Sequence, residues 1–556
     1  MTLAKSPRRA GAWTGWPLRP LLLCALAAAC CPASGADDFL YTVQSGDHPW
    51  NIAQRFLKDP SYGGQLKQLN RIGNDRRLSP GTQLRIPAEW LRLRALRVRL
   101  LAVHGDTVVI PGAGAGRAAI AGDELLPGTL LRTGPQASAT LEFEDGSRVL
   151  VRRDSELRLV RSSQALIHAG ALVEIDLLRG ALENVVKPVA NPSGRFEIRA
   201  PAAIAAVRGT QFRVSATDTH SRTEVLEGGV LVANPAGQSA TGAGLGTLAA
   251  LGRAPDPPTP LLAAPDLSTL PERFERLPID WPLPAVAGAA GYRTQFAPDD
   301  RFSLLVLDEV AAAPRARALD IADGSYVLRM RAIDAKGLEG LSAERALVVH
   351  ARPEPPLLIE PAPDAVTVSE RPTFRWSRAN AAWHYRLEIT PADASTGTTP
   401  LQKTVTPADG ATIQVELPVG VHSWRVASVD PARGRQGPWG DRQSFRRVLP
   451  GPGVEPPQVA AGSVTLRWSA QPRVSNYRLQ VAGDDTFGQL LADVRPTAPQ
   501  HQLEHLVAGT YHIRVQSTGE DGYVGPWGTV QSFTVPPEPP QYWKALLILL
   551  PFLLAL

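Results

Sequence analysis

The sequence predicts a multidomain, mainly β protein: one small βααβ unit, an all-β roll or solenoid, and three β-sandwich repeats. Three observations predict this class. The chain has 556 residues, more than one hydrophobic core normally serves. Pro-rich segments at 254–260, 352–356, 450–457 and 536–540 divide its second half into intervals the size of one small sandwich. Within these intervals apolar and polar residues alternate, as in strands that are buried on one side.

Residues 1–36 have the pattern of a secretory signal. Basic residues precede the apolar run "LLLCALAAACC", and small residues follow it, so we expect cleavage after Ala36. An uncleaved anchor and a lipoprotein signal, lipidated at Cys30 or Cys31, are the alternatives. All three cysteines, Cys24 included, lie in this segment, so the mature chain would hold no thiol and no disulfide. Removing the four basic residues of the signal lowers the formal charge from +5 to +1, which gives no argument for nucleic-acid binding.

Residues 41–87 predict a strand, two short helices and a closing strand. Asp47 or His48 can cap the first helix, and Pro49 suits its first turn because a proline there loses no hydrogen bond. Ile52 with Phe56, and Ala53 with Leu57, form an apolar face at helical spacing. The second helix is expected in "GGQLKQLN" with Leu66 and Leu69 buried, and the closing strand at 83–86.

This segment resembles the lysin motif (LysM), through Tyr41, Val43, "GD", "WNIA", "LN", "PG" and "LRIP". The resemblance implies binding of N-acetylglucosamine polymers, peptidoglycan or chitin, in a shallow groove between two loops. It places Gly46, Asp47, His48 and Pro49 on one side of the groove. On the other side it places Asn70, Arg71, Ile72 and Gly73. His48 and Pro49 replace the small hydroxyl residue and Leu that the family usually has there.

The region 91–250 is expected to be all β. "ATLEFEDGSRVLV" predicts a hairpin in which Leu141 and Phe143 face one way, Asp145-Gly146 turn the chain, and Val149 and Val151 return. In "EWLRLRALRVRLL" apolar residues alternate with Arg, with a phase slip at 95–96, which favours a half-exposed strand over an anion-binding patch. The hairpin and the later "LLRGAL", "VRGTQF" and "LEGGVLV" resemble the FecR domain over about 96–235. FecR proteins include periplasmic partners of iron-uptake signalling, with a cytoplasmic anti-sigma segment before a membrane span. No such segment precedes the signal here, so we expect only the periplasmic module to carry over.

The three intervals that follow are copies of one another. Trp376 and Tyr385 in the second copy have the same spacing as Trp468 and Tyr477 in the third, and the first copy is more divergent. Leu466 and Trp468 are expected to share one buried face. Two further buried sets are expected, Tyr477, Leu479 and Val481, and Tyr511, Ile513 and Val515. The copies resemble fibronectin type III domains. The predicted divisions are 1–36 signal peptide, 37–90 LysM, 91–250 FecR-like, 251–277 Pro-rich linker, 278–351, 352–449 and 450–535 repeats, and 536–556 Pro-rich linker with an apolar tail.

No catalytic or metal-binding residues and no cofactor are predicted. "HQLEH" (501–505) would lie on a strand, where residues four apart do not chelate easily. Asp299-Asp300 and Asp484-Asp485 recur before Phe in two repeats, which indicates a structural turn and not a glycosidase pair. The apolar tail from Ala545 would span only ~18 Å as a helix against a hydrocarbon core of ~30 Å. Membrane contact and a docking peptide are its two interpretations, of which we favour the first.

These patterns predict a non-enzymatic, exported protein of the periplasm or cell envelope, with possible membrane association through the tail. Its expected partners are peptidoglycan and an unidentified envelope protein, with no nucleic acid. A FecR-type periplasmic sensor or regulator and an accessory subunit of a cell-wall hydrolase are the alternatives.

Overall fold

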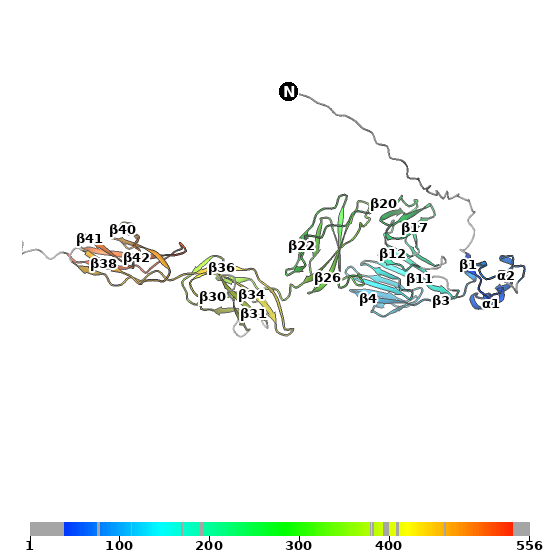
Figure 1. The fold of residues 1–556 in the computed structure, drawn as a ribbon, viewed down its shortest axis with the longest axis horizontal. Helices are drawn as coiled ribbons and strands as arrows, with labels where there is room; N and C mark the ends of the chain where they lie inside the picture. The colour runs from blue at the N-terminus through cyan, green and yellow to red at the C-terminus, as the bar shows by residue number, and fades with distance from the viewer. Residues whose placement is uncertain are drawn as a thin grey trace, which may run out of the picture.

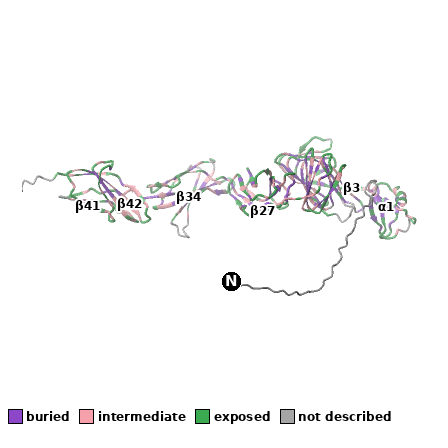
Figure 2. Cartoon of the chain, turned by 90° about the horizontal axis from the view of Figure 1, so that it is seen from above, coloured by how far each residue is buried: buried purple, intermediate pink, exposed green. Residues whose placement is uncertain are grey.

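The computed structural model describes residues 38–537 except 75–77, 113, 168–170, 189–193, 208, 379, 381–382, 393–399, 407–410 and 461–462. The expected signal segment with its three cysteines, and the apolar tail, lie outside the described residues. Five β-rich bodies follow one another in a line, and two views at right angles agree on this (Figures 1 and 2). None of the described helices has the length and apolar character needed to cross a membrane.

The first body is the βααβ unit predicted for the lysin motif. It consists of β1 (Asp38–Thr42), α1 (Pro49–Phe56), α2 (Tyr62–Leu69) and β2 (Gln83–Pro87), followed by a short 3-10 turn, η1 (Ala88–Trp90). The predicted helix face is buried, since Ile52, Ala53 and Leu57 are inaccessible to solvent. Leu69 was wrongly expected to be buried: it is 40% exposed, because the single buried leucine on α2, Leu66, already fills the space over α1.

The FecR-like domain is built from two sheets that share one long strand. Its strands are β3 (Leu93–Ala95), β4 (Val98–His104), β5 (Thr107–Ile110), β6 (Arg117–Ala118), β7 (Glu124–Leu125), β8 (Leu130–Thr133), β9 (Ser138–Phe143), β10 (Arg148–Val151), β11 (Glu156–Ala165), β12 (Ala171–Val185), β13 (Arg195–Arg199), β14 (Ile204–Val207), β15 (Gln211–Ala216), β16 (His220–Glu227), β17 (Gly229–Asn234), β18 (Gly237–Gly242), β19 (Leu245–Ala250) and β20 (Thr259–Pro260). The first part of β12 pairs with β11, and its last part pairs with β10 and β15.

Gly180 is the bend at which β12 passes from one sheet to the other. Its φ is +93°, a region that only glycine enters freely. A Cβ at this position would lie 2.2–2.6 Å from atoms of Ser155. The predicted hairpin is confirmed next to this bend: Leu141 pairs with Val149, and Ser147 donates its backbone N–H to Asp145 in the turn. The predicted phase slip near 95–96 is the break between β3 and β4.

Three sandwiches, here called repeats 1, 2 and 3, complete the described chain. Repeat 1 holds β21 (Arg273–Phe274), β22 (Ile279–Pro282), β23 (Gly291–Ala297), β24 (Leu307–Ala311), β25 (Arg315–Ala318), β26 (Gly324–Ile333) and β27 (Ala343–Val349). Repeat 2 holds β28 (Leu358–Glu360), β29 (Ala365–Thr367), β30 (Thr373–Trp376), β31 (His384–Pro391), β32 (Leu401–Val405), β33 (Thr412–Gln414), β34 (Gly420–Asp430), β35 (Arg435–Trp439) and β36 (Gln443–Arg447). Repeat 3 holds β37 (Gln458–Ala460), β38 (Ser463–Arg467), β39 (Val474–Ala482), β40 (Leu490–Val494), β41 (Gln500–Glu504), β42 (Gly509–Gly519), β43 (Val524–Trp527) and β44 (Gln531–Val535).

The predicted core anchors of the repeats are confirmed. The rings of Trp376 and Tyr385 lie 5.6 Å apart, and those of Trp468 and Tyr477 have the same separation. The predicted sets around Leu466, Tyr477 and Tyr511 are all buried. The range 251–277, predicted as a linker, contributes β20 to the FecR-like domain and β21 to repeat 1.

Candidate functional site

The two loops predicted to bind glycan lie at the same end of the small sheet. Because Thr42 pairs with Gln83, the end of β1 and the start of β2 are neighbours. The segment 43–48 follows this end of β1, and Asn70 is hydrogen-bonded to the backbone of Arg85 near the start of β2. Gly46, His48, Arg71 and Gly73 are exposed there. These four residues present backbone groups, the His48 imidazole and the Arg71 guanidinium at the surface.

The side chain of Asp47 is buried and has a structural role. Its side chain is 3% exposed. One oxygen accepts hydrogen bonds from the Tyr41 hydroxyl (2.5 Å) and the Gln44 backbone N–H (2.8 Å), and the other lies 3.3 Å from Arg55. Burial, together with the hydrogen bond to Asp47, raises the pKa of Tyr41 to about 12. The buried carboxylate of Asp47 therefore stabilises the conformation of the first loop.

His48 is the residue that caps α1. Its Nδ1 accepts the Asn51 backbone N–H at 3.2 Å, and its own N–H donates to the Asn51 side chain at 2.8 Å, a reciprocal capping box. Pro49 follows at the first helical position and is buried. Sequence reasoning offered two capping candidates, and the burial of Asp47 leaves this role to His48.

Asn70 and Ile72 also serve the fold of the second loop. The Asn70 side chain makes a two-way bridge to the backbone of Arg85, accepting at 2.6 Å and donating at 2.7 Å, and so ties the loop to β2. Ile72 packs against the unit's core. Sequence reasoning did not place Trp50 in the site, although the structure leaves it 46% exposed two residues after His48. Trp50 is one of the residues that match the LysM pattern, so the sequence could have identified it as a candidate.

A second distinctive region is the junction between the FecR-like domain and repeat 1, where charged groups are buried. Glu183 and Arg152 come from the FecR-like domain, and Arg331 and Glu339 come from repeat 1. Arg331 is 1% exposed and donates to both Glu183 and Glu339 at 2.9 Å. Arg152 reaches Glu339 at 2.9 Å. Burial by itself would raise the pKa of Glu183, but Arg329, Arg331 and Arg152 outweigh it and hold that pKa well below its usual range.

Apolar and backbone contacts reinforce this junction. Leu150 of β10 packs with Phe302 and Leu305 of repeat 1. Ser138 on β9 both donates to and accepts from the backbone of Leu305, and Thr140 donates to the carbonyl of Ser303. The loop that follows Asp299 therefore packs on the face of the sheet that contains β9, a strand paired on both sides by β4 and β10.

The sheet face of repeat 1 that carries Arg329 has counterparts in repeats 2 and 3, and these counterparts are built differently. On these faces Gln295, Glu388 and Gln480 stand opposite Arg329, Arg425 and Arg514, respectively. In repeats 2 and 3 a tryptophan covers the arginine: Trp439 lies 4.6 Å from Arg425, and Trp527 lies 4.5 Å from Arg514. The corresponding segment of repeat 1, "AKGLEGLSA", has no tryptophan and supplies Glu339 instead. In repeat 1 Arg329 lies 3.8 Å from the ring of Phe302 in the same repeat, and Glu183 of the FecR-like domain pairs with this arginine across the junction.

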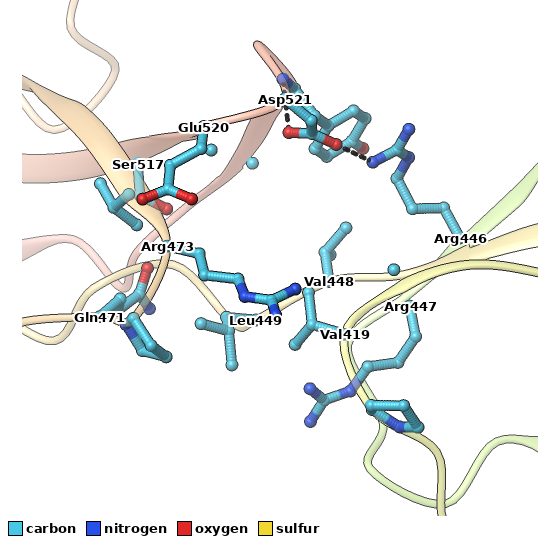
Figure 3. Close-up of a pocket in the computed structure, with 17 residues that line it drawn as sticks. Val419, Arg446, Arg447, Val448, Leu449, Gln471, Arg473, Ser517, Glu520 and Asp521 are labelled. Atoms are coloured by element: carbon cyan, nitrogen blue, oxygen red, sulfur yellow. Dashed lines mark hydrogen bonds and ion pairs between the residues drawn. The ribbon is translucent and has the colours of Figure 1, made fainter. Parts of the chain in front are cut away.

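Ion pairs also cross the other two junctions. Between repeats 1 and 2, the exposed side chain of Arg435 lies 3.1 Å from the buried carboxylate of Asp323. Arg276 meets Asp441 at 2.8 Å between repeats 1 and 2, and Arg446 meets Asp521 at 2.6 Å between repeats 2 and 3. Figure 3 shows the last of these pairs beside a cavity of about 440 Å³ that both repeats line. Exposed pairs such as Arg276–Asp441 stabilise little. Within the described ranges, no group of three or more His, Cys, Asp or Glu residues is arranged to hold a metal ion.

Fold and site together define a multidomain β protein with a lysin-motif unit, a FecR-like domain and fibronectin type III-like repeats. Residues 41–87 match the family model described as LysM domain, and residues 129–231 match that described as FecR protein. LysM domains bind peptidoglycan or chitin-like N-acetylglucosamine polymers. Both families are non-catalytic binding or sensing modules typical of exported and cell-envelope proteins.

Several solved structures are similar to parts of this chain. A two-domain fibronectin type III segment of chicken tenascin shows 16% identity over 33% of this chain and 99% of its own length, with a TM-score of 0.25. The chicken interferon gamma receptor alpha chain shows 11% identity over 33% of this chain and 98% of its own, with a TM-score of 0.23. A protein of Parabacteroides distasonis designated an anti-sigma factor shows 18% identity over 22% of this chain, with a TM-score of 0.20, and the match spans 56% of that protein. No curated protein matches the chain.

Proposed function

We propose that this is a non-enzymatic cell-envelope protein that binds peptidoglycan through its LysM unit and presents the FecR-like domain and the repeats for protein contacts. The observation that carries the proposal is the pair of exposed loops around Gly46, His48, Arg71 and Gly73, inside a segment that matches the LysM family. The exposed indole of Trp50 adds a flat apolar surface of the kind that packs against a sugar ring.

The linear arrangement of the bodies supports the second half of the proposal. The lysin-motif unit is at one end of the described chain and repeat 3 is at the other (Figure 1). An anchor at one end leaves the sandwich faces at the other end accessible to an envelope protein.

Sedimentation with purified peptidoglycan tests the anchoring. We expect the mature chain to sediment with the polymer and a chain lacking residues 37–90 to remain in the supernatant. Gly73→Phe sharpens the test, because a side chain at Gly73 meets no atom within 4 Å and would fill the groove. Gly483→Phe is the control, since Gly483 is also exposed with no atom within 4 Å of an added Cβ but lies in repeat 3, outside the LysM unit. Equal sedimentation of the full and truncated chains would refute anchoring.

The FecR match also favours a second function, that of a periplasmic sensor or regulator. An accessory subunit of a cell-wall hydrolase remains the third candidate. Incubation of the purified protein with peptidoglycan separates a binding protein from an enzyme. We expect no release of muropeptides, and their release would overturn the non-enzymatic assignment.

A further inference from the structure

The buried junction between the FecR-like domain and repeat 1 encloses a cavity of about 400 Å³. Ligand sites commonly have this size and commonly lie between domains. Its inner wall carries Arg213 from β15, Arg329 and Arg331 from β26, and Glu183 from β12. Arg213 and Arg331 are 2% and 1% exposed, whereas Arg329 is 8% exposed, so Arg329 is the most accessible of the three arginines.

The charge around the cavity is not balanced by the buried acids of the junction. The buried set contains five arginines and four acids, namely Arg152, Arg213, Arg293, Arg329 and Arg331 with Glu183, Glu224, Asp308 and Glu339. The excess is one positive charge when every acid is ionised. Of the four acids only Glu183 lines the cavity.

The mouth of the cavity provides a further cation. Arg301 lies at the rim, is exposed and has no ion-pair partner among the described residues. Asp300 and Glu344 also line the cavity, and Arg148, which does so as well, is paired with Glu142.

We propose that this cavity binds a small oxyanion, a phosphate- or carboxylate-bearing molecule, which Arg329 and Arg301 hold. Guanidinium groups suit such anions because their N–H donors match two oxygens at once. Burial and the neighbouring charge of Arg331 lower the pKa of Arg329 to about 9. This shift agrees with positive charge that an anion would compensate. The site is independent of glycan binding, because it lies in a different part of the chain.

Titration calorimetry of the full chain tests the proposal, with inorganic phosphate and succinate as probes and chloride replacing them at constant ionic strength. We expect saturable binding at one site per chain for at least one probe. The probe that binds identifies the source of the oxyanion, phosphate or carboxylate. Absence of saturable binding by both, or equal effects of chloride, would overturn the proposal.

Three variants locate the binding. Arg329→Lys keeps the positive charge next to Glu183 but loses the paired N–H donors of the guanidinium group. It should therefore weaken binding about 10-fold or more. Arg301→Gln changes an exposed side chain that the fold does not use, so it keeps the test valid if the first variant folds poorly, and it should weaken binding several-fold. Arg514→Lys, at the matching position of repeat 3, should leave affinity unchanged. Wild-type affinity in both cavity variants would refute the site.

Discussion

Replacing Asp308 by Asn tests whether the buried junction makes the FecR-like domain and repeat 1 one unfolding unit. The Asp308 side chain is 5% exposed, pairs with Arg293 and lies 3.4 Å from Arg152 across the junction. Asn keeps the shape and removes the charge, so two buried guanidinium groups lose a counter-charge. Breaking a buried ion pair costs about 3–5 kcal/mol.

Repeat 3 offers a matched control for this change. Arg478 and Asp493 lie 185 residues after Arg293 and Asp308, and they pair at 2.6 Å on the same sheet face. There the two side chains are 37% and 32% exposed, because no other domain covers them. Asp493→Asn should therefore cost only about 0–1 kcal/mol.

Differential scanning calorimetry of the full chain separates the two cases. A unit of this size shifts its Tm by roughly 2–4 °C per kcal/mol. Asp308→Asn should therefore lower the transition of the joined unit by about 6–20 °C, and Asp493→Asn should leave that transition in place. A shift below about 2 °C for Asp308→Asn would refute the reasoning, since the junction would then not contribute to the stability of either body.

Three further predictions concern the fold. Gly180→Ala should lower the free energy of unfolding by at least about 2 kcal/mol, because it combines a strained φ with a close contact to Ser155. Gly146→Ala also introduces a side chain at positive φ, but only a lysine side chain lies near, so it should lower that free energy less in the same melting experiment. Asp47→Ala should destabilise the LysM unit by about 2–4 kcal/mol, since the Tyr41 hydroxyl and the Gln44 N–H lose their acceptor; unchanged melting, followed by tryptophan fluorescence, would contradict this. The depressed pKa values of Glu183 and Glu339 contribute stability that is present above the ordinary glutamate pKa of about 4.3 and is lost as pH falls below it. The raised pKa of Glu224 has the opposite effect, because its contribution to stability is lost as pH rises above about 4.3. Calorimetry at stepped pH should show that the Tm of the joined unit decreases as pH falls below about 4.3.

Local patterns in the sequence predicted most elements because these elements depend on near neighbours. Ile52 and Ala53 reached the core as helical spacing indicated. Leu141 and Val149 paired as the Asp-Gly turn between them indicated. In both cases the determining contacts lie within about ten residues, where periodicity and turn chemistry are informative.

The sequence was less informative where a side chain's role depends on a distant partner. The LysM resemblance places Asp47 on one side of the glycan groove, and the sequence did not reveal that the Tyr41 hydroxyl and Arg55 draw its carboxylate inward. Arg329 and Arg331 occupy the polar side of an alternating strand, which normally faces water. Only the folded chain brings Glu183, about 150 residues earlier, onto that side.

The segment that matches the FecR family is shorter than the folded FecR-like domain. The FecR match covers residues 129–231, whereas β3 pairs with β11 and β19 pairs with β16, so strands on both sides of the match complete its sheets. Repeat 1 then covers Arg152 and Arg213, charged groups that a fragment ending before it would leave without Glu339. Repeats 2 and 3 cover an arginine with their own indole, whereas in repeat 1 Phe302 stacks on Arg329 and Glu183 of the preceding domain pairs with the same arginine. A fragment intended to represent the FecR-like function should accordingly include residues 91–351.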